Sequence, residues 1–103
     1  MDESPPAADA GPVVLELGPG AGAVVAYTGA DWIGQEVEIG AVDGTTPRRH
    51  AYVRERAVGA DRVWAVVLPG LAPGPYRLWA PDGSPLDRVQ VRAGTVSEVR
   101  VRH

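Results

Sequence analysis

The segment Leu68–Trp79 constrains the fold of this chain more than any other part of the sequence. An apolar run ends at Pro69-Gly70, a short hydrophobic step leads to Pro73-Gly74, and a second apolar run opens at Tyr76. Proline presets a turn-forming φ angle and glycine accepts positive φ, so closely spaced Pro-Gly pairs redirect the chain sharply. The segment therefore predicts a corner at the edge of a small β-sandwich.

The composition also favours strands. The chain has 103 residues, enough for one domain with a modest core, and its apolar residues include 16 Val against 6 Leu, 2 Ile and no Phe. Valine is stiff at χ1, which lowers helix propensity and suits a pleated sheet. The 13 Gly and 10 Pro supply frequent turns. Because there is no cysteine, disulfides and thiolate sites are excluded.

Short apolar runs alternate with turn signals about every 8 to 12 residues, the spacing typical of an all-β sandwich or barrel. The only helical signal is a single turn over Gly29–Ile33, for which Asp31 is the expected N-cap. We predict an all-β fold, a single antiparallel β-sandwich of seven to eight strands. The expected strands are Val13–Leu17, Ala23–Thr28, Glu36–Val42, His50–Val58, Arg62–Leu68, Tyr76–Ala80, Leu86–Arg92 and Val96–Arg102.

Charge divides the chain into two parts. Residues 1–11 contain three acidic residues among Pro and Ala and few large apolar ones, so we predict a disordered acidic tail there and a β-sandwich domain over residues 12–103. That domain balances ten Arg against ten acidic residues, which argues against a nucleic-acid partner. There is no secretory signal pattern and no apolar run near the roughly 20 residues of a membrane span. We expect a cytoplasmic protein.

Two resemblances follow from specific motifs. The second half of the chain, roughly 62–102, resembles transthyretin-like, carboxypeptidase regulatory-like and Cna-B-type sandwiches, through its strand, L-x-x-G-x-Y corner, strand and glycine-terminated hairpin. The resemblance implies a transthyretin-like sandwich, with an Ig-like one as the alternative. The chain also resembles small actinobacterial proteins loosely labelled phospholipases, through V-L-E-L-G near the start, Arg48-Arg49-His50 and Gly74–Trp79. That label implies a small hydrolase.

No catalytic set emerges from the motifs. Val14–Gly22 looks like the glycine-rich motif of methyltransferases, but the residues after it are typical of a strand rather than the helix that motif requires. A G-x-S-x-G elbow is missing, and His50 and His103 are the only histidines. The Tyr-Arg-Gly-Ser ending of transthyretin-like hydroxyisourate hydrolases is also missing, since Tyr76-Arg77 continues into Leu78. We therefore assign no catalytic residue, metal site or cofactor.

The candidate binding residues form a basic and aromatic stripe. Alternation along the expected strand His50–Val58 places His50, Tyr52, Arg54 and Arg56 on one face, with Arg48 and Arg49 leading in. Arginine and aromatic residues suit contacts with a protein or an anionic ligand. The alternative is a solvated face whose bases pair with Glu36 and Glu38 on a neighbouring strand. Two tryptophans complete the set: Trp32, expected exposed in a loop, and Trp79, on the polar side of its strand.

These observations favour a non-catalytic binding or accessory module with an unknown protein partner. Contact is expected through the basic and aromatic stripe or a free sheet edge, which would also allow a weak homodimer. Two alternatives stay open: a small hydrolase, and a carbohydrate- or small-ligand-binding module that uses Trp32 and Trp79.

Overall fold

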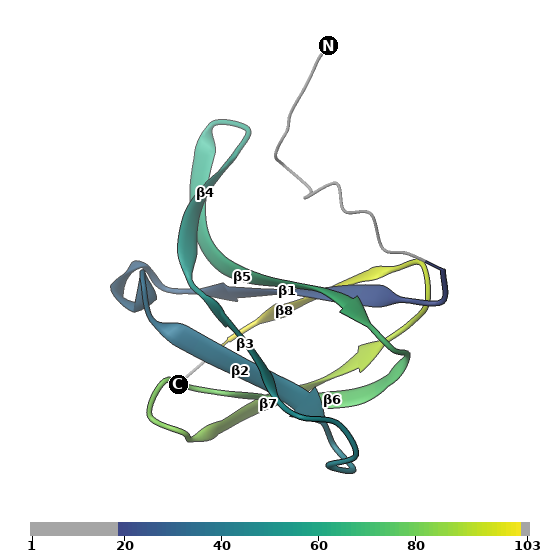
Figure 1. Cartoon of the computed structure of the whole chain (residues 1–103). Helices are drawn as coiled ribbons and strands as arrows, with labels where there is room; N and C mark the ends of the chain where they lie inside the picture. Colours follow the sequence, from purple (N-terminus) through teal and green to yellow (C-terminus); the bar gives the residue numbers. More distant parts are fainter. Residues whose placement is uncertain (1–18, 102–103) are drawn as a thin grey trace.

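Eight β-strands in two sheets of four make up most of residues 19–101, the part of the chain that this computed structural model describes (Figure 1). Sheet A has the order β4-β5-β1-β8, and sheet B has the order β3-β2-β6-β7. The all-β expectation is confirmed. The bounds are β1 Gly22–Thr28, β2 Glu36–Ala41, β3 Arg49–Tyr52, β4 Arg54–Val58, β5 Asp61–Leu71, β6 Gly74–Trp79, β7 Pro85–Val91 and β8 Val96–Arg100, with a 3-10 turn η1 at Ala30–Trp32.

Some expectations fall outside this region. The tail over residues 1–11 and the strand Val13–Leu17 lie outside the described residues. Within residues 19–101, no helix has the length and apolar character needed to cross a membrane. The single helical turn is present, but its N-cap is Gly29, without a side-chain hydrogen bond, so the prediction of Asp31 as N-cap was wrong.

One strand pair departs from the antiparallel prediction. β1 and β8 run parallel, in a regular register from Ala23 opposite Val96 to Tyr27 opposite Arg100. Sheet A is therefore mixed, since β1 is antiparallel to β5 on its other side. The two parallel strands lie at opposite ends of the described chain and no hairpin connects them. Side-chain alternation is the same for either strand direction, so the sequence pattern did not show this.

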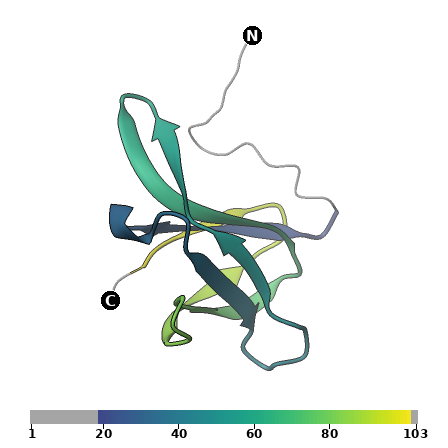
Figure 2. The same ribbon diagram turned by 60° about the vertical axis from the view of Figure 1, so that its left-hand side comes forward.

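The expected strand His50–Val58 is in fact two strands that belong to different sheets. β3 pairs with β2 in sheet B, whereas β4 pairs with β5 in sheet A (Figure 2). The break falls at Val53, whose side chain is only 1% exposed. The Val53 N–H donates to the Gln35 carbonyl at 2.9 Å, and the Val53 carbonyl accepts from Gly34 N at 2.8 Å. These two hydrogen bonds hold the chain where it changes sheets.

The predicted corner at Leu68–Trp79 connects the two sheets. β5 ends at Leu71 and β6 begins at Gly74 in the other sheet. Pro69-Gly70 does not end β5; these two residues lie in a bulge, because Gly22 is opposite Leu71 while Val24 is opposite Leu68. A bulge leaves extra residues outside the regular ladder, which lets a strand contain a proline. Gly70 has a φ of 70° at this point.

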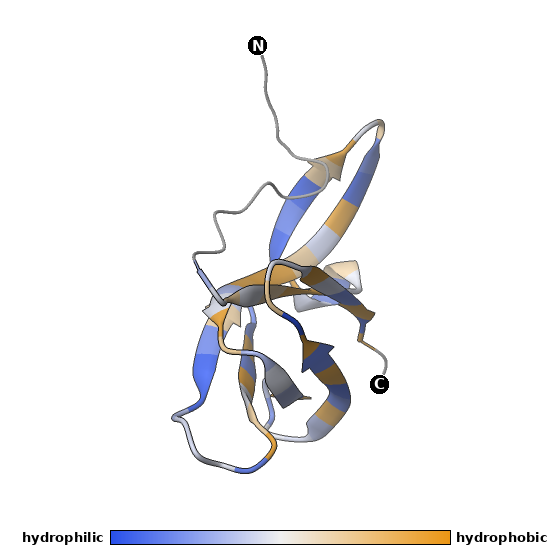
Figure 3. Ribbon diagram, turned by 90° about the vertical axis from the view of Figure 1, so that its right-hand side faces the viewer, coloured by the Kyte–Doolittle hydropathy of each residue, from blue (hydrophilic) through white to orange (hydrophobic). Residues whose placement is uncertain are grey.

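Side chains from both sheets share one hydrophobic core. Cross-strand partners place alternate residues of each strand on the same side, and in Figure 3 apolar and polar residues alternate along several strands. The core cluster is nearly inaccessible to solvent and includes Val24, Ala26, Val66 and Leu68 from sheet A, Val37, Ile39, Tyr76 and Leu78 from sheet B, and Trp32 from η1.

A side-chain contact reinforces the parallel pair and makes its stability sensitive to pH. The Tyr27 hydroxyl donates to Glu98 Oε2 at 2.7 Å. Burial first, and then the hydrogen bond and charge of Glu98, raise the pKa of Tyr27, against the opposing charge of Arg100. The folded state thus favours the neutral phenol. Its contribution to stability is complete below the ordinary tyrosine pKa of about 10 and is lost as pH rises through the higher folded-state pKa.

The melting temperature of the natural chain should therefore fall more steeply above about pH 10 than that of Tyr27→Phe, which has no phenol to ionise. Thermal unfolding followed by circular dichroism from pH 8 to 11.5 measures this difference. Tyr52→Phe is the matched control, because Tyr52 is exposed, and its pH profile should follow that of the natural chain. Identical profiles for the natural chain and Tyr27→Phe would contradict the role of this contact.

Candidate interaction surfaces

The predicted stripe of basic and aromatic residues is divided between the two sheets. His50 and Tyr52 lie on β3 in sheet B, whereas Arg54 and Arg56 lie on β4 in sheet A. Arg49 also lies on β3, but on the opposite face from His50 and Tyr52. It is opposite the buried Ile39, and its Nη1 donates to the carbonyl of Gly70 at 3.4 Å. The expectation of one continuous face was wrong, because the chain changes sheets within the segment.

A second grouping replaces the stripe on the solvent side of sheet B. Glu38 has His50 as its cross-strand partner on one side and Trp79 on the other. Glu36 is opposite Tyr52 in the same way. Cross-strand partners share a face, and these residues alternate with core residues along their strands. We call this grouping the sheet B outer face; its residues are Glu36, Glu38, Arg48, His50, Tyr52 and Trp79.

Arg48 and Trp79 form the centre of the sheet B outer face. The Arg48 guanidinium carbon lies 3.5 Å from the centroid of the Trp79 ring, and Arg48 Nη1 donates to Glu38 Oε1 at 3.1 Å. Gly40 makes room for this stack. A Cβ atom added there would lie 3.0 Å from Arg48 Cγ and 3.3 Å from the indole ring. A cation held over an aromatic face and paired with a carboxylate is restrained before any partner arrives.

His50 and Tyr52 extend the same face along β3. His50 Nδ1 forms an ion pair with the Glu36 carboxylate. Tyr52 is 55% exposed, so its ring is available for contact. The pairing of the bases with Glu36 and Glu38 matches the alternative expectation of a solvated face. The structure brings His50, Tyr52 and Trp79 together with Arg48, which leads into the predicted stripe.

Trp32 does not belong to any described surface. Its side chain is 5% exposed and lies in the core cluster. The prediction of an exposed indole was wrong. Three residues of 3-10 turn carry too little periodicity to show which way an aromatic ring points, so no sequence pattern indicates the direction of the Trp32 ring.

Arg54 and Arg56 lie on the outer side of a hairpin made by β4 and β5. They are opposite Ala65, which is fully buried, and Val63, which is half-buried. Burial, and secondly the charge of Arg54, lower the pKa of the Arg56 guanidinium. Arg56 Nε is buried and has no hydrogen-bond partner among residues 19–101.

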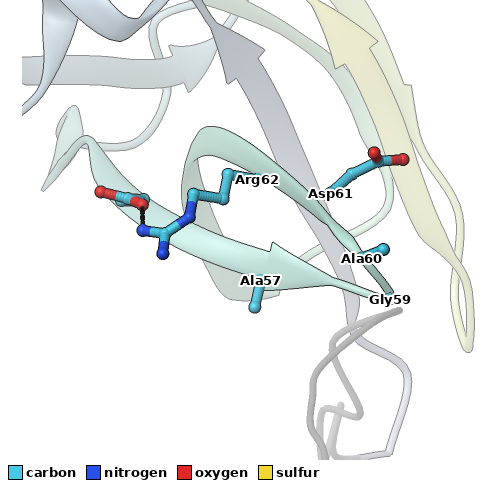
Figure 4. A pocket seen from close by; sticks show the side chains of 6 residues that line it. Ala57, Gly59, Ala60, Asp61 and Arg62 are labelled. Carbon is cyan, nitrogen blue, oxygen red and sulfur yellow. Dashed lines mark hydrogen bonds and ion pairs between the residues drawn. The ribbon is translucent and has the colours of Figure 1, made fainter.

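The tip of the same hairpin borders an open depression of about 480 Å³ (Figure 4). Its lining is Glu55, Ala57, Gly59, Ala60, Asp61 and Arg62. Arg62 forms an ion pair with Glu55, a carboxylate on the apolar side of its strand. Two carboxylates and one paired guanidinium, with no histidine or hydroxyl, offer no nucleophile activated by a base.

The described contacts do not assemble a hydrolytic or metal site. The Ser84 hydroxyl donates to Asp82 at 2.5 Å and the Ser97 hydroxyl to the Gln90 carbonyl at 2.9 Å, whereas His50 pairs with Glu36. Each potential triad member therefore has a different partner. Within residues 19–101, no group of three or more His, Cys, Asp or Glu side chains could hold a metal ion.

Comparisons with other proteins add no family. No protein-family model matches the sequence, and no curated protein or solved structure is significantly similar to it.

Proposed function

We propose that this chain is a non-catalytic binding module that contacts a partner protein through the sheet B outer face. The observation that carries the proposal is the stack of Arg48 on Trp79 at 3.5 Å, on the same sheet face as the exposed ring of Tyr52. Tyr, Trp and Arg are the residue types most enriched at the energetic centres of protein interfaces. Here Tyr52 lies on β3 and Trp79 on β6, on either side of β2, and Arg48 directly precedes β3.

Restraint of the cation supports this use of the face. Arg48 is held by both Glu38 and Trp79, so less side-chain freedom would be lost when a partner binds. The charges of Glu36, Glu38 and His50 near it are already paired, so binding there would not leave these three groups without a partner. A hydrogen-bonding rim of Glu36 and His50 around an aromatic centre fits a protein surface.

The same contacts make the two alternatives less suitable. A sugar-binding site needs an open aromatic face, but Arg48 covers one face of Trp79, and Trp32 lies in the core. A hydrolase needs a base beside its nucleophile, and the ring nitrogen of His50 faces Glu36 instead.

We further propose that the two sheets form a transthyretin-like sandwich. The support is the order of features after β5: a corner into the other sheet, β6, its hairpin partner β7, and a turn at Gly94. This is the order of the strand, corner and hairpin pattern in the sequence. The fold alone names no partner, because one fold hosts many functions.

An affinity experiment with surface variants tests the binding function. The natural chain and an Arg48→Glu, Tyr52→Ser double variant would be used as baits in lysate of the source organism, with Arg92→Glu as control. Arg92 is exposed in the turn between β7 and β8, and it is not part of the sheet B outer face. We expect at least one partner that the natural chain and the control both retain. Its recovery with the double variant should be lower by at least about tenfold.

Equal partner recovery by all three baits, with unchanged far-ultraviolet circular dichroism, would contradict the proposed face. Hydrolysis of an ester or phospholipid by the purified chain that His50→Ala abolishes would contradict the non-catalytic function itself.

A further inference from the structure

A second surface, at the edge of sheet A, has features that the proposed function does not use. β4 is the last strand of that sheet and pairs, among the described strands, only with β5. β5 pairs with β4 through residues 61–65 and with β1 through residues 64–71. The far half of the hairpin therefore extends beyond the end of β1, as Figures 1 and 2 show. The outer edge of β4 is thus an exposed row of backbone donors and acceptors.

The charges along β4 are incompletely paired. Arg48, His50 and Arg62 on neighbouring segments pair with Glu38, Glu36 and Glu55. Arg49 donates to the Gly70 carbonyl. Arg54 and Arg56 have no carboxylate partner within 4.0 Å among residues 19–101, and Arg56 Nε has no hydrogen-bond partner.

The unpaired guanidiniums are two residues apart, so they lie on the same face of the strand, above apolar cross-strand neighbours. Val58, 37% exposed, continues that face toward the hairpin tip. An edge strand protected against aggregation often carries such charges. An apolar residue beside two unpaired cations also forms a pattern that an oppositely charged strand can match.

We propose that the outer edge of β4 binds an extended acidic segment of a partner protein as a fifth strand of sheet A. Two carboxylates at alternate positions of that segment face Arg54 and Arg56, and an apolar side chain faces Val58. Main-chain hydrogen bonds along the edge supply affinity, and the alternating side chains supply specificity. Guanidinium–carboxylate pairs are the strongest match for these two positions.

A second copy of this chain fits the edge less well. In an antiparallel pair of β4 strands, facing residues must share a sheet face. A register centred on Glu55 then sets Glu55 opposite Glu55 and Arg54 opposite Arg56, and one centred on Arg56 sets Arg56 opposite Arg56, so both bring like charges together. A homodimer through this edge is therefore disfavoured in these two registers. The outer edge of β4 is a different surface from the sheet B outer face, and an acidic strand is a different kind of partner.

Fluorescence anisotropy with a defined peptide tests the proposal. The probe is fluorescein-labelled Thr-Val-Thr-Glu-Thr-Glu-Thr, whose Val and Glu positions match an antiparallel strand beside β4; Thr-Glu-Thr-Glu-Thr-Val-Thr serves the parallel direction. We expect saturable binding by one of them that weakens with salt. The Arg54→Glu, Arg56→Glu variant should weaken it at least about tenfold, and replacing both Glu by Lys in the peptide should restore binding to that variant.

Arg88→Glu, Arg92→Glu is the matched control, because it makes the same charge change on β7 and the turn after it and should leave the affinity unchanged. Hydrogen exchange should show new protection of amides within residues 54–58 when the peptide is bound. The proposal is overturned if neither peptide binds at millimolar concentration, if the charge-reversed variant binds equally well, or if protection appears on other strands.

Two further results would assign the edge to another partner and likewise overturn the proposal. One is a stronger Arg54- and Arg56-dependent complex with a single-stranded oligonucleotide than with either peptide. The other is a dimer by sedimentation that dissociates in the Arg54→Glu, Arg56→Glu variant.

Discussion

Gly22→Ala is expected to lower the free energy of unfolding by about 3 kcal/mol, the upper part of the range for overpacked sites. Gly22 begins β1, and an added Cβ atom would lie 2.3 Å from the Arg92 carbonyl oxygen and 2.9 Å from Val91 Cγ1. Neither neighbour is the end of a flexible exposed side chain. The methyl group can be accommodated only if the backbone of β1 or of the β7–β8 turn moves.

Hydrogen bonds resist that movement. Ala23 N donates to the Thr95 carbonyl at 3.0 Å, and Gly94 N donates to the Ala21 carbonyl at 2.9 Å, so the turn is tied to both sides of Gly22. Urea unfolding followed by tryptophan fluorescence measures the loss. Gly29→Ala is the control, since Gly29 has a φ of −81° and its added Cβ would meet only the Asp31 side chain. Equal midpoints for the two variants would show that the close approach at Gly22 can relax.

Local sequence signals located most strands of this protein. The expected strand Glu36–Val42 corresponds to β2, and Leu86–Arg92 corresponds to β7, with ends that differ by about one residue. Alternation of apolar and polar side chains and the Gly- and Pro-containing turns act within a few residues, so the sequence carries them directly. The pairing of His50 with Glu36 was also accessible, because the two strands are neighbours in sequence.

Features that depend on distant residues were not predictable in the same way. The alternation of outward and inward side chains along His50–Val58 continues unbroken through Val53. An inward apolar residue fits this alternation equally well in either sheet. What separates β3 from β4 is the pair of hydrogen bonds to Gly34 and Gln35, which no local pattern records. The stack of Arg48 on Trp79 was missed for a related reason. Its one sequence signal is Gly40, a glycine at a polar position inside a strand.

Val53→Asp is expected to destabilise the fold strongly, because Val53 lies in the core at the point where the chain changes sheets. The site is 1% exposed and belongs to the core cluster, so an aspartate there would be an unpaired buried carboxylate. We expect a loss of more than about 4 kcal/mol at pH 7, a large share of the roughly 5–15 kcal/mol of an ordinary domain. Val53→Thr, which keeps the shape but buries a hydroxyl, should lose only about 1–3 kcal/mol.

The pH dependence separates the charge from the change in shape. Burial raises the pKa of a carboxyl above its unfolded value of about 3.9. The penalty is therefore greatest above the folded-state pKa and disappears as pH falls below the unfolded one. Urea unfolding at pH 7 and pH 3.5 should show the gap between Val53→Asp and Val53→Thr shrinking in acid, each measured against the natural chain at the same pH. A gap that stays constant would mean that Val53→Asp acts through altered packing at the crossover, and no gap at pH 7 would mean that residue 53 reaches water.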